Sequence, residues 1–308
     1  MGSRPLPAHP AGQLKGRIVA AHGRHYTVEL DDGTVRKCFP RGKKAGAAVG
    51  DYVMVQPQGA EEGAIERILE RRNVLYRSDD MRSKQFAANV DLLLIVVAPQ
   101  PMFSDDLMGR ALVAARSAGM EALIILNKAD LAEGMPEARQ RLAVLAAAGI
   151  EVIELSALDI DGTKNRLLPR LRGRCGLLLG QSAMGKSTLL NALVPDADAA
   201  TQEHSQALGA GKHTTTSTRL YHLPDGSGDI IDSPGFQAFG LLHLSAHDIE
   251  QGFPEFQEGI RHCRFYNCTH RHEPGCGVLA ALERGEIAPE RHELYKRILA
   301  ENEAQNTY

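Results

Sequence analysis

The chain has 308 residues, of which 43% are hydrophobic and 24% are charged, and its formal net charge is −3. This composition is typical of a soluble globular protein, and the length suits two or three domains. The longest strongly apolar run, residues 92–98, is too short to span a bilayer, and the N-terminus lacks the apolar core of a secretory signal. We therefore expect a cytoplasmic protein without a membrane segment, beginning with a flexible tail over residues 1–13.

The first patterned region, residues 14–72, is predicted to be a small β-barrel. Short apolar runs alternate with turn signals such as Asp31-Asp32-Gly33, and they predict five strands, over residues 17–21, 26–30, 35–39, 52–56 and 64–69. Five short strands in this length suit an OB-type barrel. Residues 1–72 hold 12 Lys/Arg against 8 Asp/Glu. Basic residues and one His lie in or beside its loops and are candidates for RNA contact: Arg24, His25, Arg36, Lys37, Arg41, Lys43 and Lys44.

The second region, residues 73–240, alternates predicted strands and helices. Strands are expected over residues 90–98, 122–126, 151–155, 176–179, 219–223 and 229–231. Helices are expected over residues 105–118, with Ser104 as N-cap, and over residues 137–148 and 186–193. Such alternation predicts a mostly parallel sheet covered on both faces, the α/β class.

A phosphate-binding loop follows the predicted strand 176–179. The sequence fits G-x-x-x-x-G-K-[ST] and continues with Thr188; its members are Gly180, Gln181, Ser182, Ala183, Met184, Gly185, Lys186 and Ser187. Backbone N–H groups of such a loop, and the helix that it opens, bind phosphate oxygens. Lys186 is expected to reach the β- and γ-phosphates and Ser187 to bind Mg²⁺.

Two further motifs complete a predicted γ-phosphate site. Asp232-Ser233-Pro234-Gly235 fits D-x-x-G, in which the Asp232 carboxylate holds Mg²⁺ and the Gly235 N–H meets the γ-phosphate. Residues 209–216 resemble a switch loop, and we take Thr215 as its Mg²⁺-sensing residue, with Thr214 and Thr216 as alternatives.

A guanine site is predicted upstream of the phosphate loop. Asn127-Lys128-Ala129-Asp130 fits N-K-x-D after a strand, and Ser156-Ala157 follows the next strand. The Asp130 carboxylate accepts N1–H and the 2-amino group of guanine, which adenine lacks. Lys128 covers a face of the base, and the Ser156-Ala157 turn presents a backbone N–H to guanine O6.

The motifs stand in circularly permuted order. A Ras-type GTPase begins with the phosphate loop, whereas here the guanine motifs come first. Joining the termini of a compact domain and cutting it elsewhere preserves the site. The cut places the third region directly after D-x-x-G, so nucleotide state is expected to move that region.

Phe236 stands where many GTPases have a water-orienting Gln, which predicts slow intrinsic hydrolysis. His213 is a candidate substitute, with a loop-shaping or partner-binding role as the alternative.

The third region, residues 241–308, is predicted to bind zinc. Cys263, Cys268, His270 and Cys276 form a Cys₃His set, which is a common closed structural Zn²⁺ site. His262 and His272 are possible competing ligands, and a metal-free Cys-rich loop is the alternative to a metal site. Helices are expected over residues 277–284 and 289–300. The arginines and histidines of residues 261–272 form a second candidate RNA-binding patch.

Taken together, these residues resemble the ribosome small-subunit-dependent GTPase A family. The resemblance rests on the permuted order, the GQSAMGKST loop, GKHTTT, DSPGF and C-x₄-C-x-H-x₅-C, and it covers the chain from about Leu14. It implies an OB-fold RNA-binding domain (14–72), a circularly permuted GTPase domain (73–240) and a zinc-binding, mostly helical domain (241–308). It also implies a partner, the 30S subunit with its 16S rRNA, and subunit-stimulated GTP hydrolysis during late maturation; we expect a monomer.

Two departures and two alternative functions remain at this point. Ala183 and Met184 differ from the loop usual in the family, and Ala183 provides no ligand for potassium, so no K⁺ dependence is predicted. One alternative function is a nucleotide-regulated RNA-binding module with negligible turnover. The other is a metal-handling NTPase, against which the closed ligand set and the missing membrane segment argue.

Overall fold

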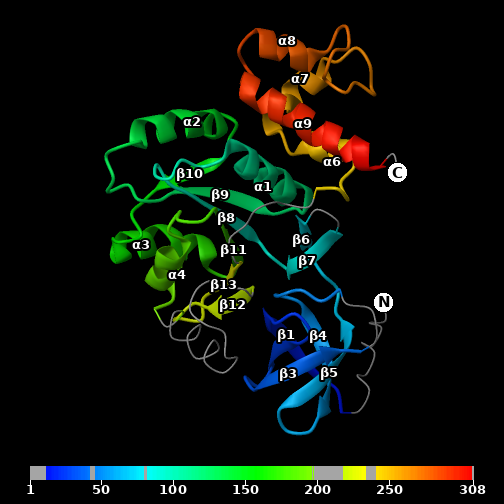
Figure 1. The fold of residues 1–308 in the computed structure, drawn as a ribbon, viewed down its shortest axis with the longest axis vertical. Coiled ribbons are helices and arrows are strands. Elements are labelled where there is room, and N and C mark those ends of the chain that lie inside the picture. The colour runs from blue at the N-terminus through cyan, green and yellow to red at the C-terminus, as the bar shows by residue number, and fades with distance from the viewer. Residues whose placement is uncertain are drawn as a thin grey trace, which may run out of the picture.

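The protein is built as three tiers along its long axis, as the computed structural model shows (Figure 1). The structure describes residues 12–41, 46–79, 82–195, 197, 218–233 and 241–306. A β-barrel forms one end, an α/β layer forms the middle, and a helical cap forms the other end. No helix within these described ranges is long and apolar enough to cross a membrane.

The first tier is a closed five-stranded barrel. Its strands are β1 (Leu14–Ala21), β2 (Tyr26–Leu30), β3 (Val35–Pro40), β4 (Tyr52–Gln58) and β5 (Glu62–Ile68). They follow the order β1-β2-β3-β5-β4, and pairing of β1 with β4 closes the barrel. In β2, Tyr26, Val28 and Leu30 alternate with half-buried residues, as expected of a strand with one face in a core. The predicted OB-like barrel is confirmed.

The middle tier is a six-stranded section of sheet with helices on both sides. The strands run in the order β10 (Glu151–Glu154), β9 (Glu121–Leu126), β8 (Leu92–Val97), β11 (Cys175–Leu179), β13 (Asp229–Asp232) and β12 (Arg219–His222). All are parallel to their neighbours except β12. Every residue of β8 and β11 is buried, which explains their continuous apolar runs. The predicted α/β architecture is confirmed.

Four helices cover this section of sheet. They are α1 (Asp105–Ser117), α2 (Met135–Ala147), α3 (Ile160–Leu171) and α4 (Lys186–Leu193). Helices α1 and α2 lie on one side of the sheet and α3 and α4 on the other (Figure 1). The Ser104 hydroxyl accepts the N–H of Leu107, so the predicted N-cap of α1 is confirmed. Helix α3 was not predicted, because Gly162 and Pro169 interrupt its helical pattern.

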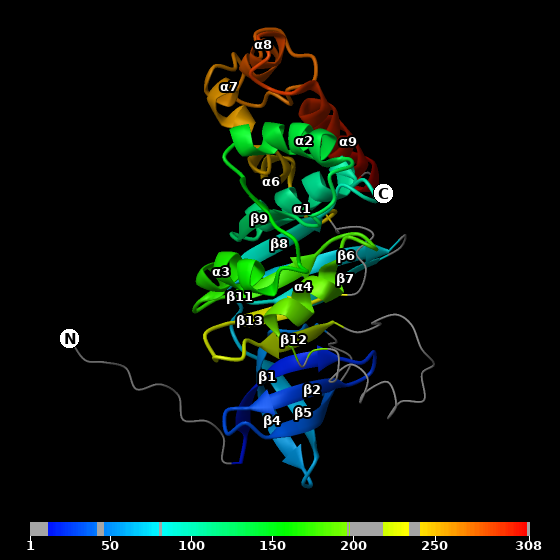
Figure 2. The same ribbon diagram turned by 90° about the vertical axis from the view of Figure 1, so that its left-hand side faces the viewer.

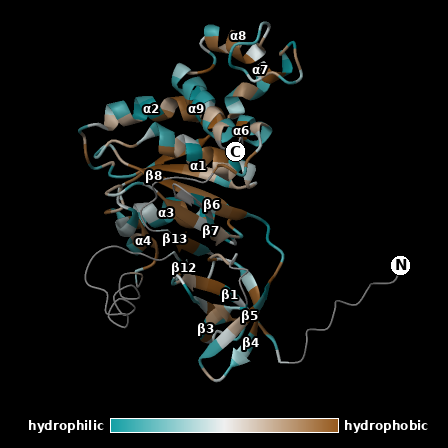
Figure 3. Cartoon of the chain, turned by 45° about the vertical axis from the view of Figure 1, so that its right-hand side comes forward, coloured by the Kyte–Doolittle hydropathy of each residue, from teal (hydrophilic) through white to brown (hydrophobic). Residues whose placement is uncertain are grey.

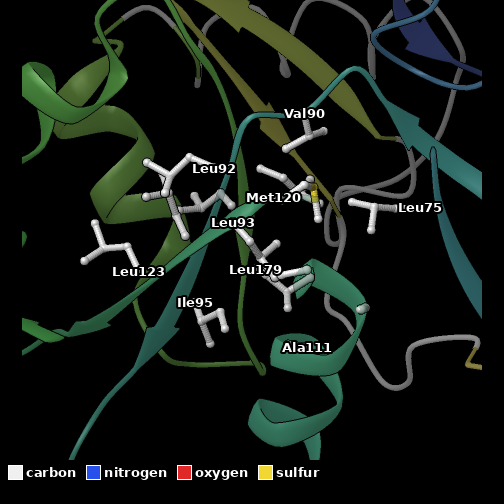
Figure 4. Packing of buried hydrophobic residues seen from close by; sticks show 14 of the residues in the cluster. Leu75, Val90, Leu92, Leu93, Ile95, Ala111, Met120, Leu123 and Leu179 are labelled. Atoms are coloured by element: carbon white, nitrogen blue, oxygen red, sulfur yellow. The ribbon is translucent and has the colours of Figure 1, made fainter. Parts of the chain in front are cut away.

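The hairpin β6 (Val74–Asp79) and β7 (Arg82–Ala88) links the barrel to the sheet and was also not predicted. Its buried members pack into the same core as the sheet, and hydrophobic residues concentrate on these central strands (Figure 3). Figure 4 shows part of this core, to which the hairpin, the sheet, α1 and the segments connecting them contribute Leu75, Val90, Leu92, Leu93, Ile95, Ala111, Met120, Leu123 and Leu179.

The barrel is joined to the sheet at strand β12 (Figure 2). Ala20 of β1 pairs with Arg219 of β12, so the two sheets are continuous. Beside this bridge, Arg17 donates to the Asp229 carboxylate at 2.5 Å. His222 lies between Asp229 (2.6 Å) and Glu29 of the barrel (3.1 Å). The hairpin β12–β13 is therefore held by both the sheet and the barrel.

The helical cap contains α6 (Ala246–Gln251), a 3₁₀ turn at Pro254–Phe256, α7 (Gln257–Arg261), α8 (Gly277–Glu283) and α9 (Pro289–Asn306). Helix α9 is longer than predicted, and α6 and α7 were not predicted. Phe253, Phe256 and Tyr295 form an aromatic core in which the ring centroids lie 5.1–5.4 Å apart. Stacked and edge-to-face aromatic pairs of this kind stabilise small cores.

Candidate nucleotide and metal sites

The predicted phosphate loop lies between β11 and α4, at the centre of the sheet. The backbone approaches its neighbours closely at two glycines: a Cβ on Gly180 would lie 2.5 Å from the Val96 carbonyl oxygen, and one on Gly185 would lie 2.4 Å from Nδ2 of Asn127. Gly185 also has a φ of +88°, which favours glycine. Ala183 has a φ of +64° and is strained for a residue with a Cβ. These positions wrap the loop over the first turn of α4.

Polar side chains fix the shape of this loop. Lys186 Nζ donates to the carbonyl oxygens of Gly180 (2.7 Å) and Gln181 (3.2 Å), which holds its ammonium over the loop. The Gln181 side-chain oxygen accepts the Ser104 N–H at 2.8 Å, so the loop is tied to the start of α1. Sequence reasoning missed this contact, because no motif connects the two positions.

Around the loop, Ser182, Ser187 and Thr188 are exposed, and Met184 is buried. Exposed hydroxyls at the first turn of a helix are available as ligands. The buried Met184 side chain, by contrast, anchors the loop in the core.

Asp232 ends β13, the strand beside the phosphate loop, and pairs with Leu178 of β11. Burial raises the pKa of Asp232 to about 6, although the nearby Lys186 cation opposes this shift. A partly buried carboxylate at the carboxyl end of a strand, next to the phosphate loop, can serve as an oxygen ligand for a hard cation such as Mg²⁺. The other residues predicted for the γ-phosphate side, His213, Thr215, Gly235 and Phe236, lie outside the described residues.

The predicted base site lies at the ends of β9 and β10, and Asn127 connects it to the phosphate loop. Asn127 is 1% exposed. Its Nδ2 donates to the Met184 carbonyl at 3.0 Å, and its Oδ1 accepts the Ala157 N–H at 2.9 Å. One side chain thus joins three motifs that are far apart in the sequence. Both of its amide atoms bind backbone groups, so Asn127 holds the predicted base loop against the phosphate loop.

The remaining base-site residues lie around Asn127. Lys128 has a φ of +61°, and its Nζ donates to the Gln100 carbonyl at 2.7 Å. The Asp130 carboxylate is exposed and accepts the Ser156 hydroxyl at 2.5 Å. The hydrogen bond orients the carboxylate and leaves it accessible to a base. No sequence motif pointed to Gln100, because its contact uses a backbone carbonyl.

The four predicted metal ligands converge in the cap. The ligand atoms of Cys263, Cys268, His270 and Cys276 all lie within 4.8 Å of one another. Nδ1 of His270 faces the sulfurs of Cys263 (3.5 Å) and Cys276 (3.4 Å). Its Nε2 lies 2.8 Å from Oε2 of Glu250, a residue that the sequence did not indicate.

The two histidines considered as competing ligands do not belong to this cluster. Among the described residues, the group of possible metal ligands comprises only the three cysteines and His270. His262 Nε2 is instead 3.1 Å from a Glu258 oxygen, and His272 is exposed. Three thiols and one imidazole within this distance form a possible metal site.

Comparisons with known proteins agree along almost the whole chain. The chain is 65% identical over 298 residues to the small ribosomal subunit biogenesis GTPase RsgA of Bordetella pertussis, covering 97% of this chain and 99% of the relative. The protein of the same name from Burkholderia pseudomallei is 55% identical over 301 residues, covering 96% of each.

Solved structures show the same architecture. YjeQ from Thermotoga maritima superposes with a TM-score of 0.71 at 30% identity, covering 94% of this chain and 98% of that one. YloQ, described as a circularly permuted GTPase, gives a TM-score of 0.68 at 27% identity, covering 97% and 99%. The family described as RsgA GTPase matches residues 68–242. With its base motifs preceding the phosphate loop and joined to it through Asn127, this chain belongs to the RsgA GTPase family.

Proposed function

We propose that this protein hydrolyses GTP to GDP and phosphate and assists late maturation of the 30S ribosomal subunit, which stimulates the hydrolysis. The main structural support for nucleotide binding is the Asn127 contact, because it fixes the proposed base-binding loop against the phosphate-binding loop. The ribosomal part is supported by relatives at 55–65% identity that are named for biogenesis of the small ribosomal subunit. We further propose that the protein acts as a cytoplasmic monomer.

In this proposal, Lys186 and the loop N–H groups bind the β- and γ-phosphates. Ser187 and Asp232 would hold Mg²⁺, which neutralises phosphate charge during transfer. An ionised Asp232 is needed for this role, and a pKa of about 6 leaves it mostly ionised at neutral pH. Thr215, Gly235 and His213 remain predictions for metal sensing, γ-phosphate contact and orientation of the attacking water.

Guanine selection is assigned to the exposed Asp130 carboxylate, with Lys128 over the base and the Ser156-Ala157 turn at O6. We expect Asp130→Asn to shift preference from guanosine toward xanthosine nucleotides, because an amide can donate to the 2-oxygen of xanthine. Competition of GDP and XDP for a fluorescent nucleotide measures the shift. An unchanged preference would remove Asp130 from the base site.

We propose that the Cys₃His cluster holds one structural zinc ion. Tetrahedral zinc with Zn–S bonds of about 2.3 Å requires sulfurs roughly 3.8 Å apart. The Sγ atoms of Cys263 and Cys276 are separated by 3.9 Å, and four committed ligands leave no open position for catalysis. Metal analysis of the purified protein tests this assignment.

Two surfaces are proposed to face rRNA. On the barrel, His22 stacks on His25 at 4.9 Å, His25 lies 6.0 Å from Phe39, and Lys37 lies over the Phe39 ring at 5.2 Å. Aromatic rings interleaved with a cation suit the stacking of unpaired bases. The predicted contacts Arg36 and Arg41 are less available, because Arg36 binds barrel carbonyls and Arg41 binds Glu66. Lys43 and Lys44 lie outside the described residues.

The second surface is the tip of the metal-binding loop. Phe265 and Tyr266 are 41% and 103% exposed, and Arg264 lies over the Phe265 ring at 5.4 Å. Exposed aromatic rings beside arginine favour contact with RNA bases and phosphates. Of the other arginines in this patch, Arg271 pairs with Glu303.

The test is cosedimentation with purified 30S subunits under a GTP analogue and under GDP, combined with turnover measured with and without subunits. We expect binding under the analogue and a subunit-dependent rise in phosphate release. Lys186→Ala should abolish stimulated turnover. Binding without stimulated turnover would instead favour a nucleotide-regulated RNA-binding module, and absence of binding would contradict the ribosomal role.

A further inference from the structure

The predicted metal ligand His270 makes a contact through each ring nitrogen. Nδ1 faces the sulfurs of Cys263 and Cys276. On the opposite side, Nε2 lies 2.8 Å from Oε2 of Glu250. The His270 and Glu250 side chains are 2% and 15% exposed, so water has little access to this pair. If Nδ1 binds the metal, Nε2 carries the ring proton and donates a hydrogen bond to the Glu250 carboxylate.

Glu250 belongs to α6, which lies outside the metal-binding loop. Helix α6 begins with a capping box, in which Ser245 and Asp248 bond reciprocally. It packs against α1 of the middle tier and against α9 of the cap. After it, Gly252 meets α1 so closely that a Cβ there would lie 2.7 Å from Val113 Cγ2. Helix α6 thus contacts both the metal-binding loop and the middle tier.

Helix α9 holds the same loop in a different manner. His292 lies 2.7 Å from the His270 carbonyl oxygen, and the Tyr295 hydroxyl donates to the Thr269 carbonyl at 3.1 Å. These contacts fix the backbone of the loop. The Glu250 contact reaches the imidazole itself, so it determines the ring tautomer and the direction of Nδ1.

We infer that Glu250 is a positioning residue for the metal centre and that it makes metal binding and the packing of α6 on α1 depend on each other. A carboxylate that accepts the distal N–H of a ligating His makes the ring a better ligand, and losing it costs about 10–100-fold in metal affinity. Because such coupling is reciprocal, metal binding in turn stabilises α6 in its place against α1. This inference rests on the metal site proposed above and does not involve GTP or RNA.

The test compares Glu250→Ala and Glu250→Gln with Glu258→Gln in the full-length protein. Glu258 is a suitable control because it lies in the same tier and pairs with Arg261 and His262, but it is exposed and makes no contact with His270. Zinc affinity is measured by competition with a chelator, and amide hydrogen exchange is measured over α6. Circular dichroism checks that each variant folds.

We expect Glu250→Ala to weaken zinc binding about 10–100-fold. Glu250→Gln should weaken it less, because its amide oxygen still accepts the N–H but carries no charge. Glu258→Gln should stay within about twofold. Exchange over α6 should be faster in zinc-depleted wild type and in zinc-saturated Glu250→Ala than in zinc-saturated wild type.

Two outcomes would overturn the inference: zinc binding by Glu250→Ala as tight as that of wild type, or α6 exchange that does not respond to zinc. If Glu250→Ala fails to fold, the nearly isosteric Glu250→Gln takes its place in the zinc-affinity measurement. Zinc affinity in Glu250→Gln equal to that of wild type would then overturn the inference. A wild-type protein that binds no zinc would reject both the metal site and the role of Glu250. Turnover and 30S binding are separate readouts, so their failure would reject the proposed function alone.

Discussion

Replacing Asn127 by alanine would remove the side chain that joins the base loop to the phosphate loop. Two buried backbone groups would lose their partners, the Met184 carbonyl and the Ala157 N–H. Leaving a buried polar group unsatisfied costs about 1–3 kcal/mol, and some relaxation is expected, so we predict a loss of about 3 kcal/mol in the free energy of unfolding. Both loops should also shift, which we expect to weaken GDP binding by at least about tenfold, or roughly 1.4 kcal/mol.

A matched control separates stability from binding. Asn302 is also buried, and its Nδ2 donates to the Leu244 carbonyl at 2.9 Å, but it lies in α9 of the cap. Asn302→Ala should therefore destabilise the protein by a similar amount while leaving GDP affinity within about threefold. Urea unfolding followed by circular dichroism measures stability. Because the chain has no Trp, affinity is best measured by anisotropy of a directly excited fluorescent GDP.

Two results would refute this reasoning. Wild-type GDP affinity in Asn127→Ala, despite its lower stability, would mean that the two loops are positioned independently. Equal losses of affinity in both asparagine variants would mean that general destabilisation, and not the loop contact, controls binding.

Three further predictions concern other contacts. Ala183→Gly should raise stability by about 1 kcal/mol, because it relieves a left-handed φ at a residue with a Cβ; a lower melting temperature would contradict this. The folded-state pKa of Asp232 is raised, so the carboxyl stabilises the fold most below pH 3.8, and this contribution is lost as pH rises through about 6. Asp232→Asn should therefore raise the melting temperature of the nucleotide-free protein more at pH 8 than at pH 5, and wild-type Mg²⁺-dependent GTP affinity should fall below pH 6. Arg17 and Asp229 are 14% and 19% exposed, so a double-mutant cycle with alanine should give a coupling of about 1–3 kcal/mol, and a value near zero would show that the pair does not hold the barrel.

The sequence predicted elements whose signals are local. Strand β2 and helix α4 have the predicted bounds, because turn residues delimit the first and the phosphate-loop motif opens the second. Helix α3 was missed because Gly162 and Pro169 disfavour helix, yet Thr163, Leu167 and Leu171 bury one face of it. Tertiary packing here outweighs propensity.

The same distinction applies to the sites. The four metal ligands share one short motif, so sequence spacing predicted that they would come together. The partner of His270 could not be predicted, because Glu250 lies on a different helix and one Glu among many gives no signal. Likewise, N-K-x-D indicated a role for Asn127 in base binding. Its bonds to Met184 and Ala157 depend on the sheet order, which places β9 beside β10 and only β8 between β9 and β11.

The joint between barrel and sheet also constrains how the protein folds as it is made. Arg17 and Asp229 are 212 residues apart, and at about 5–20 residues per second the second follows the first by roughly 10–40 s. The barrel closes on itself through β1 and β4, so it can fold long before β12 exists. During that interval the end of β1 around Ala20 is an unpaired edge, and the nearby Arg17 guanidinium is a charge that discourages pairing with a foreign strand. Once the hairpin β12–β13 is synthesised, the same Arg17 guanidinium pairs with Asp229 and holds the hairpin against the barrel.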